Sequence, residues 1–180
     1  MKKTLIQRAD VTESLGRAAI EFTNISGSYT DLYLVASLRS DRSGNPVDVL
    51  ELEFNGDSTN RSSRRLYGNS SAADSGSFTN GRIGLTNAST ATSNSFGSVS
   101  IHIANYASSN AKSVSVDNIS ENNSGAANYA FQEITAFLWD DSAAITSVKL
   151  IPQLGTVFVQ YSSASLYGIT AGNDGITTVS

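Results

Sequence analysis

The sequence predicts an all-β domain: an antiparallel two-sheet β-sandwich of jelly-roll type with about eight to ten short strands. Short stretches that alternate apolar and polar residues recur along the 180-residue chain, with turn signals roughly every 8 to 15 residues. About a third of the residues are Ser, Thr or Asn, which are typical of turns and loops between strands. No stretch keeps the apolar period of a long helix.

The chain length suits one domain with a substantial core. We divide it into an N-terminal arm at 1–17, the β-sandwich domain at 18–169 and a polar C-terminal tail at 170–180. The arm places charged residues around Leu5 and Ile6. It is expected either to be a mobile terminus or to lie on a neighbouring subunit.

In the first half, the clearest strand is 31–39, in which four alternate apolar residues would share one face. Further strands are expected at 20–25, 49–54, 64–67 and 82–85. Polar loops are expected at 40–46, 68–81 and 87–95. Long loops often carry function, so these loops and the arm are where we expect a working surface.

In the second half, strands are expected at 96–103 and 113–119, each with apolar residues on alternate positions. The stretch 130–139 is rich in large apolar residues, including Ile134 and Leu138, and is expected to contribute heavily to the core. The stretch 143–169 has the densest apolar content. It predicts a strand, a turn, a strand at 157–161 and a last strand that closes the core.

Composition disfavours or excludes several functional classes. The net charge is −4, whereas nucleic-acid-binding domains usually carry a strong basic stripe, so we expect no nucleic-acid partner. No segment approaches the ~20 apolar residues that cross a bilayer, and we expect no membrane partner. Gln7, Arg8 and Asp10 interrupt any signal-peptide-like region, which favours synthesis in a cytoplasm without export by that route. The absence of cysteine excludes disulfides, zinc–thiolate sites and cysteine nucleophiles.

The residues that could carry catalysis do not form a recognisable set. His102, the only histidine, lies within an alternating strand, and we expect a structural role for it. The carboxylates that could form a hydrolytic pair are Glu51 with Glu53, Asp57, and Asp140 with Asp141. Each fits a turn or a polar strand face. We expect no enzyme activity, no cofactor and no metal, with calcium held by loop oxygens as an alternative.

Two further groups of residues allow alternative interpretations. Five arginines lie near loops: Arg39 and Arg42, then Arg61, Arg64 and Arg65. They could protect an exposed sheet edge from aggregation, or form a contact patch for an acidic partner or a glycan. Trp139 ends the most apolar strand and is expected in the core. The alternative is an aromatic platform for a sugar, formed by Trp139 or Tyr106.

Six short blocks stand out in combination: 22–25 (FTNI), 29–40 (YTDLYLVASLRS), 52–57 (LEFNGD), 96–106 (FGSVSIHIANY), 143–150 (AAITSVKL) and 162–169 (SSASLYGI). Together they resemble the β-sandwich structural proteins of tailed bacteriophages, especially phages of cyanobacteria and other aquatic bacteria. The resemblance spans most of 18–169. Proteins of this kind include capsid decoration (cement) proteins and domains of head or tail fibres.

The resemblance implies a non-enzymatic virion protein that is commonly a homotrimer. We expect a capsid decoration protein that is made in the host cytoplasm, binds the major capsid protein on the outer capsid surface and stabilises the shell. The expected capsid contacts are Lys2, Lys3, Arg8 and Arg17. The alternative is a receptor- or carbohydrate-binding domain of a head or tail fibre, with a host-surface glycan as its partner.

Overall fold

The computed structural model describes residues 2–69, 71–123 and 130–171 and confirms an all-β sandwich. The strands in these ranges are β1 (Lys2–Asp10), β2 (Ile20–Phe22), β3 (Asp31–Leu38), β4 (Val47–Phe54), β5 (Arg61–Gly68), β6 (Ala73–Phe78), β7 (Arg82–Asn87), β8 (Gly97–Ile103), β9 (Lys112–Ser120), β10 (Phe131–Trp139), β11 (Val148–Pro152) and β12 (Ser163–Thr170). They form an eight-stranded sheet, β1-β12-β3-β8-β9-β10-β5-β6, and a four-stranded sheet, β2-β11-β4-β7. All the pairs are antiparallel.

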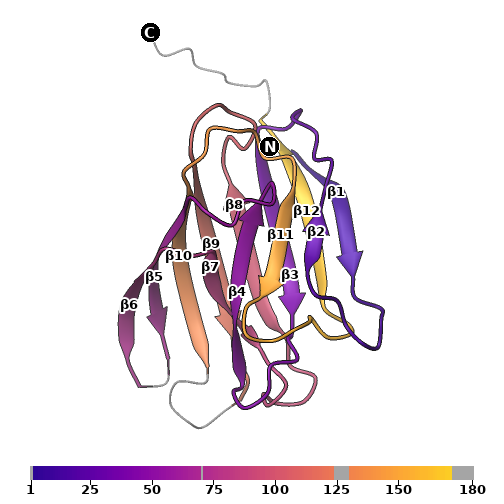
Figure 1. The fold of residues 1–180 in the computed structure, drawn as a ribbon, viewed down its shortest axis with the longest axis vertical. Helices are drawn as coiled ribbons and strands as arrows, with labels where there is room; N and C mark the ends of the chain where they lie inside the picture. Colours follow the sequence, from indigo (N-terminus) through magenta and orange to yellow (C-terminus); the bar gives the residue numbers. More distant parts are fainter. Residues whose placement is uncertain (1, 70, 124–129, 172–180) are drawn as a thin grey trace.

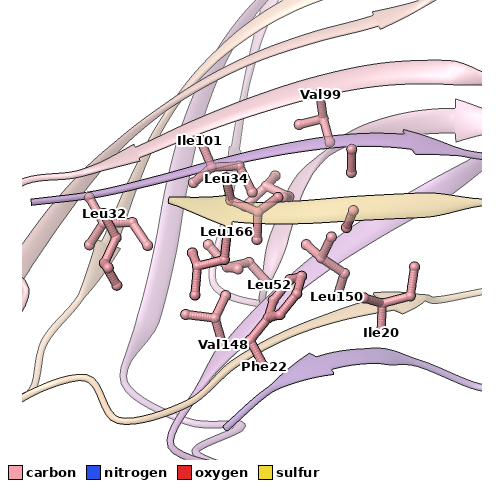
Figure 2. Packing of buried hydrophobic residues seen from close by; sticks show 14 of the residues in the cluster. Ile20, Phe22, Leu32, Leu34, Leu52, Val99, Ile101, Val148, Leu150 and Leu166 are labelled. Carbon is pink, nitrogen blue, oxygen red and sulfur yellow. The ribbon is translucent and has the colours of Figure 1, made fainter. Parts of the chain in front are cut away.

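The two sheets face each other across a large apolar core (Figures 1 and 2), and Val47, Val49 and Leu85 form a second, smaller cluster. Figure 2 shows Leu34 and Leu166 of the larger sheet directed toward Leu52 and Leu150 of the smaller one. All four side chains are fully buried. The alternate apolar residues predicted to share one face of β3 and one face of β8 are buried as well, so the period-two interpretation is confirmed for both strands.

The N-terminal segment is a strand of the sandwich, so the prediction of a separate arm is wrong for this stretch. Strand β1 lies at the edge of the larger sheet and pairs with β12 along its length, with a register shift between Leu5 and Gln7. Val11 follows in the core, and its backbone bonds to that of Ser162 and Tyr161. The physical reason is that β12 would otherwise leave a row of backbone groups without partners.

The stretch predicted as a strand at 157–161 is irregular. It forms only isolated bridges, in which Phe158 pairs with Arg17 and with Ser40. Tyr161 has a φ of 75°, which breaks the extended conformation before β12 begins. Phe158 is nevertheless fully buried, so the apolar content of this stretch serves the core without a regular ladder.

Two other predicted boundaries also differ. The loop predicted at 68–81 contains β6, which pairs with β5 as a hairpin at the edge of the larger sheet. The sequence does not predict this strand because most of its residues are small or polar. The predicted tail at 170–180 begins with the final residue of β12. Residues 172–180 lie outside the described residues.

Strand β10 turns only part of its apolar content toward the core. Ile134 and Leu138 face solvent, with 58% and 38% of their surfaces exposed, whereas Glu133 is completely buried. The prediction that these two aliphatic residues serve the core is wrong. Trp139 packs on Phe54 in the core, with ring centroids 5.6 Å apart, and this contact sets the phase of the strand. A period of two then turns Glu133 inward.

The larger sheet extends past the smaller one on one side. Strand β7 ends the smaller sheet and lies against β9 and β10. Strands β5 and β6 continue the larger sheet beyond it, at the side of the molecule (Figure 1). The interior therefore changes from purely apolar under β3 and β12 to partly polar near β5, β7 and β10.

A substitution in β12 tests how tightly the sandwich is packed. The Tyr29 ring lies on Gly168, and a methyl group at this position would clash with the ring. We expect Gly168→Ala to lower the free energy of unfolding by about 1–3 kcal/mol because the ring must move. Gly68→Ala in β5 is the matched control, since a Cβ there meets no atom within 4 Å. Equal effects of the two changes in urea denaturation would contradict the packing.

Candidate functional site

The four residues predicted to contact a capsid do not form one cluster. Lys2, Lys3 and Arg8 lie on β1, and Arg17 lies in the following connection. Arg8 bonds to Asp10 at 2.6 Å, and Arg17 bonds to Glu13 at 2.5 Å, so an acidic neighbour neutralises each guanidinium. The Lys3 ammonium lies 3.9 Å from the centre of the Tyr33 ring. Of these four residues, Lys2 and Lys3 are therefore the two without a carboxylate partner among the described residues.

Arg39 is a structural residue that neither interpretation of the arginines foresaw. Only 9% of its surface is exposed, and burial lowers the pKa of its guanidinium. Its Nη1 donates to the carbonyl oxygens of Thr92 and Ser95, both at 2.8 Å. Its Nη2 donates to those of Ser89 and Ala91 at 3.1 and 3.2 Å. One side chain thus holds the whole loop at 89–95 against the sandwich.

Two more arginines of this set also bond to backbone. Arg42 donates to the carbonyl of Val47 at 2.7 Å, and Arg61 donates to that of Leu52 at 2.9 Å. Of the five arginines, Arg64 is the exposed one, in a position to meet a partner. The proposed common contact patch is therefore not formed.

The remaining arginine belongs to an ion cluster between the sheets. Glu133 of β10 is completely buried, and its Oε1 accepts hydrogen bonds from Arg65 of β5 and from Arg82 of β7, the latter at 3.1 Å. Burial lowers the pKa of Arg82, and the negative charge of Glu133 opposes that effect. The Phe78 ring lies 5.2 Å from the Arg65 guanidinium and 4.9 Å from that of Arg82. This cluster joins the margins of both sheets.

The ion cluster is not fully satisfied. Glu133 Oε2 and the Nε atoms of Arg61, Arg65 and Arg82 are buried without a hydrogen-bond partner among the described residues. Unsatisfied buried polar atoms carry a desolvation cost of about 1–3 kcal/mol each. The ion pairs of the cluster therefore offset only part of the cost of burying its charges.

Other buried charges hold turns in the same way as Arg39. Lys112 is 1% exposed, and its ammonium donates to the carbonyls of Ser108 and Ala143 at 2.9 and 2.7 Å. Asp48 is completely buried and accepts hydrogen bonds from the backbone N–H groups of Leu154 and Gly155. Lys112 and Asp48 are therefore structural residues, each of which holds loop backbone against the sandwich.

The candidate catalytic residues make structural contacts. His102 lies in β8 as predicted, with Nε2 3.4 Å from Asp31. Glu53 is 8% exposed and faces Lys149 at 3.4 Å, which corrects the expectation of an exposed polar face. Among the described residues, no three His, Asp or Glu side chains group closely enough to hold a metal ion.

The two aromatic residues proposed as sugar platforms are buried. Trp139 is 1% exposed, which confirms its place in the core, and Tyr106 is completely buried. The Trp139 Nε1 donates to Asp57 at 2.8 Å, and the Tyr106 hydroxyl donates to the carbonyl of Ser26. Neither ring can stack on a sugar, so the aromatic-platform alternative is wrong.

Two surface hollows are the strongest candidates for binding. A groove of about 640 Å³ lies on β5, β6 and β10 and is lined by Leu66, Tyr67, Gly68, Ala73, Asp74, Ser75, Gln132 and Ile134. A polar hollow of about 590 Å³ lies among the end loops and is lined by Gly44, Pro46, Thr90, Ala91, Thr92, Ser93, Asn122 and Asn123. The first groove includes β6, which lies in a predicted loop, and the second includes residues of the predicted loops at 40–46 and 87–95.

The comparisons with known proteins do not narrow the function. No protein-family model, curated protein or solved structure matches the chain. None of the described segments is a helix with the length and apolarity that crossing a membrane requires.

The ion cluster gives a first prediction for this region. Glu133→Gln removes the carboxylate that faces two buried guanidinium groups, so we expect the free energy of unfolding to fall by about 3–5 kcal/mol. Glu21→Gln, at an exposed position in β2, is the control and should change it by less than ~0.5 kcal/mol. Urea denaturation checks both variants, and an unchanged midpoint for Glu133→Gln would refute the role assigned to the cluster.

Asp57 gives a prediction about pH. Hydrogen bonds from the Thr59 hydroxyl and then from Trp139 lower the pKa of Asp57 to about 2. Because the folded-state pKa is lowered, this contribution to stability is present above the ordinary value of 3.8 and is lost as the pH falls through about 2. We expect Thr59→Val to raise the pKa toward 3.8 in an NMR titration of the carboxyl carbon. Thr156→Val, which removes the corresponding hydroxyl from Asp41, should leave Asp57 unchanged.

Proposed function

We propose that this chain is a bacteriophage virion structural protein: a capsid decoration protein that binds the major capsid protein on the outer capsid surface and stabilises the shell. The observation that carries the proposal is where the resembling blocks lie. Those at 29–40, 96–106 and 162–169 contain β3, β8 and β12, which are neighbours in the larger sheet. The others lie along β2, β11 and β4, which are neighbours in the smaller sheet. The blocks therefore meet in one part of the sandwich.

The strand order also supports the proposal. Without the hairpin β5–β6 and the pair β9 and β10, eight strands remain. Their order is β1-β12-β3-β8 in the larger sheet and β2-β11-β4-β7 in the smaller one. If these eight strands are numbered 1 to 8 along the chain, the two orders are 1-8-3-6 and 2-7-4-5. We read this as the order of a jelly roll, an architecture of viral capsid and lectin domains.

Attachment to the capsid would use the β1 edge of the larger sheet. Lys2 and Lys3 present positive charge there, whereas Asp10 and Glu13 neutralise Arg8 and Arg17. An acidic surface on the major capsid protein fits this edge. Binding free energy repeated at many identical sites would stabilise the shell by mass action. The homotrimer implied by the resemblance would place three such edges around one axis.

The polar hollow favours a second candidate function, a carbohydrate-binding domain of a head or tail fibre. Hydroxyl and amide groups such as those of Thr90, Ser93 and Asn123 suit the hydroxyls of a host-surface glycan. Because Trp139 and Tyr106 are buried, recognition would rest on hydrogen bonds without aromatic stacking. Arg39 supports this reading by holding the loop that contributes several lining residues.

Quantifying the chain in purified virions tests the proposal. We expect a copy number comparable with that of the major capsid protein, together with binding of the isolated chain to empty capsids that weakens as salt is added. The double variant Lys2→Glu, Lys3→Glu should lose most of that binding, because it places negative charge against an acidic surface.

The matched control Lys2→Arg, Lys3→Arg keeps both charges and should bind as the unchanged protein does. A few copies per virion, located on a fibre or at the tail, would contradict the decoration role and favour the glycan-binding candidate.

A further inference from the structure

The outer face of β10 is unusual for a strand inside a sheet. Strand β10 lies between β9 and β5, and its solvent-facing residues are Gln132, Ile134, Ala136 and Leu138. Leu66 of β5 lies opposite Ile134 and is 65% exposed. Together with Ile119 of β9, these residues form an apolar stripe across three strands, which we call the outer stripe: Leu66, Ile119, Ile134, Ala136 and Leu138.

The rest of the same face shows that the stripe is local. The face of an antiparallel sheet that meets water is normally polar. Strand β8 follows this rule with Ser98 and Ser100, and so does the first part of β9 with Ser113 and Ser115. A contiguous exposed apolar patch rimmed by polar residues marks an interaction site.

Two charges of opposite sign flank the outer stripe. Arg64 of β5 is opposite Ala136, and Asp117 of β9 is opposite Ile134. Both are exposed, and neither forms an ion pair with any described residue. Among the described residues, Arg64 donates a hydrogen bond to the carbonyl of the adjacent Ser63 alone. The two charges lie on opposite sides of the stripe. The positive charge of one copy can therefore meet the negative charge of another.

The shape of this face is also complementary to itself. The groove of about 640 Å³ beside the stripe is hollow because Gly68, Ala73 and Ser75 are small, while Leu66 and Ile134 project next to it. Projecting aliphatic side chains of one copy can enter the groove of another. With strands ~4.8 Å apart and residues ~3.3 Å apart, four strands of eight residues present roughly 500 Å² in projection, which approaches the ~800 Å² of accessible surface per partner of a standard interface.

We propose that this face binds the same face of a second copy of the chain. A two-fold axis lying in the contact brings Arg64 of each copy to Asp117 of the other and buries the two outer stripes against each other. We assign a second copy as the partner because the face is complementary to itself. It carries one exposed charge of each sign, and it has projecting aliphatic side chains beside a groove that could receive them. This contact is distinct from the three-fold association implied by the resemblance, and it does not depend on the proposed function.

Sedimentation equilibrium of the purified chain tests the apolar part of the contact. The unchanged protein should form a dimer, or a hexamer if trimers also form. Ile134→Glu should weaken this association by roughly 100-fold or more, giving monomers or trimers, because a carboxylate would be buried in an apolar contact. Leu154→Glu is the control, since Leu154 is exposed to nearly the same extent, 55% against 58%, but lies in a loop after β11.

Charge exchange tests the geometry. Arg64→Asp and Asp117→Arg should each weaken the two-fold association about tenfold, and the double variant should restore it, because the pair is re-formed with its signs reversed. Circular dichroism checks that every variant is folded. A monomeric unchanged protein overturns the proposal, as does a trimer that Ile134→Glu leaves unaltered. A double variant no better than the weaker single variant overturns the two-fold arrangement.

Discussion

The unequal width of the two sheets is the constraint on which most of this structure depends. A four-stranded sheet covers only part of an eight-stranded one, so the larger sheet has a covered region and a margin. In the covered region, β3 and β12 bury apolar faces. At the margin, Arg65, Arg82 and Glu133 share the space between the sheets, where the ion pairs offset part of the cost of burying their charges. The outer stripe lies on the other face of that same margin.

Buried charged side chains also fix the loops by hydrogen bonds to their backbone. Long polar connections bring carbonyl and N–H groups close to the sandwich, and each of these groups needs a partner. Arg39 and Lys112 satisfy several carbonyls each, and Asp48 satisfies two N–H groups. These charges are therefore structural, although from the sequence they look like surface residues. The end loops keep a fixed shape because one buried side chain fixes several of their backbone groups.

The two proposed contacts use opposite ends of the larger sheet. Strand β1, with Lys2 and Lys3, is at one edge, and the β5–β6 hairpin is at the other. A protein of this shape can bind a surface through one edge while it meets another copy of itself through the opposite margin. Between the two ends, β12, β3, β8 and β9 are joined by continuous hydrogen-bonded ladders.

The sequence by itself determined the fold class, most strand positions, the buried faces of β3 and β8 and the place of Trp139 in the core. These follow from local periodicity, which assigns residues to two faces of a strand. Periodicity does not say which face another sheet will cover, so the phase of β10 and the outer stripe were decided by tertiary packing. The place of β1 and the roles of the arginines were decided in the same way. The partners of β1 and Arg39 lie far along the chain, and only the closed sandwich brings them together.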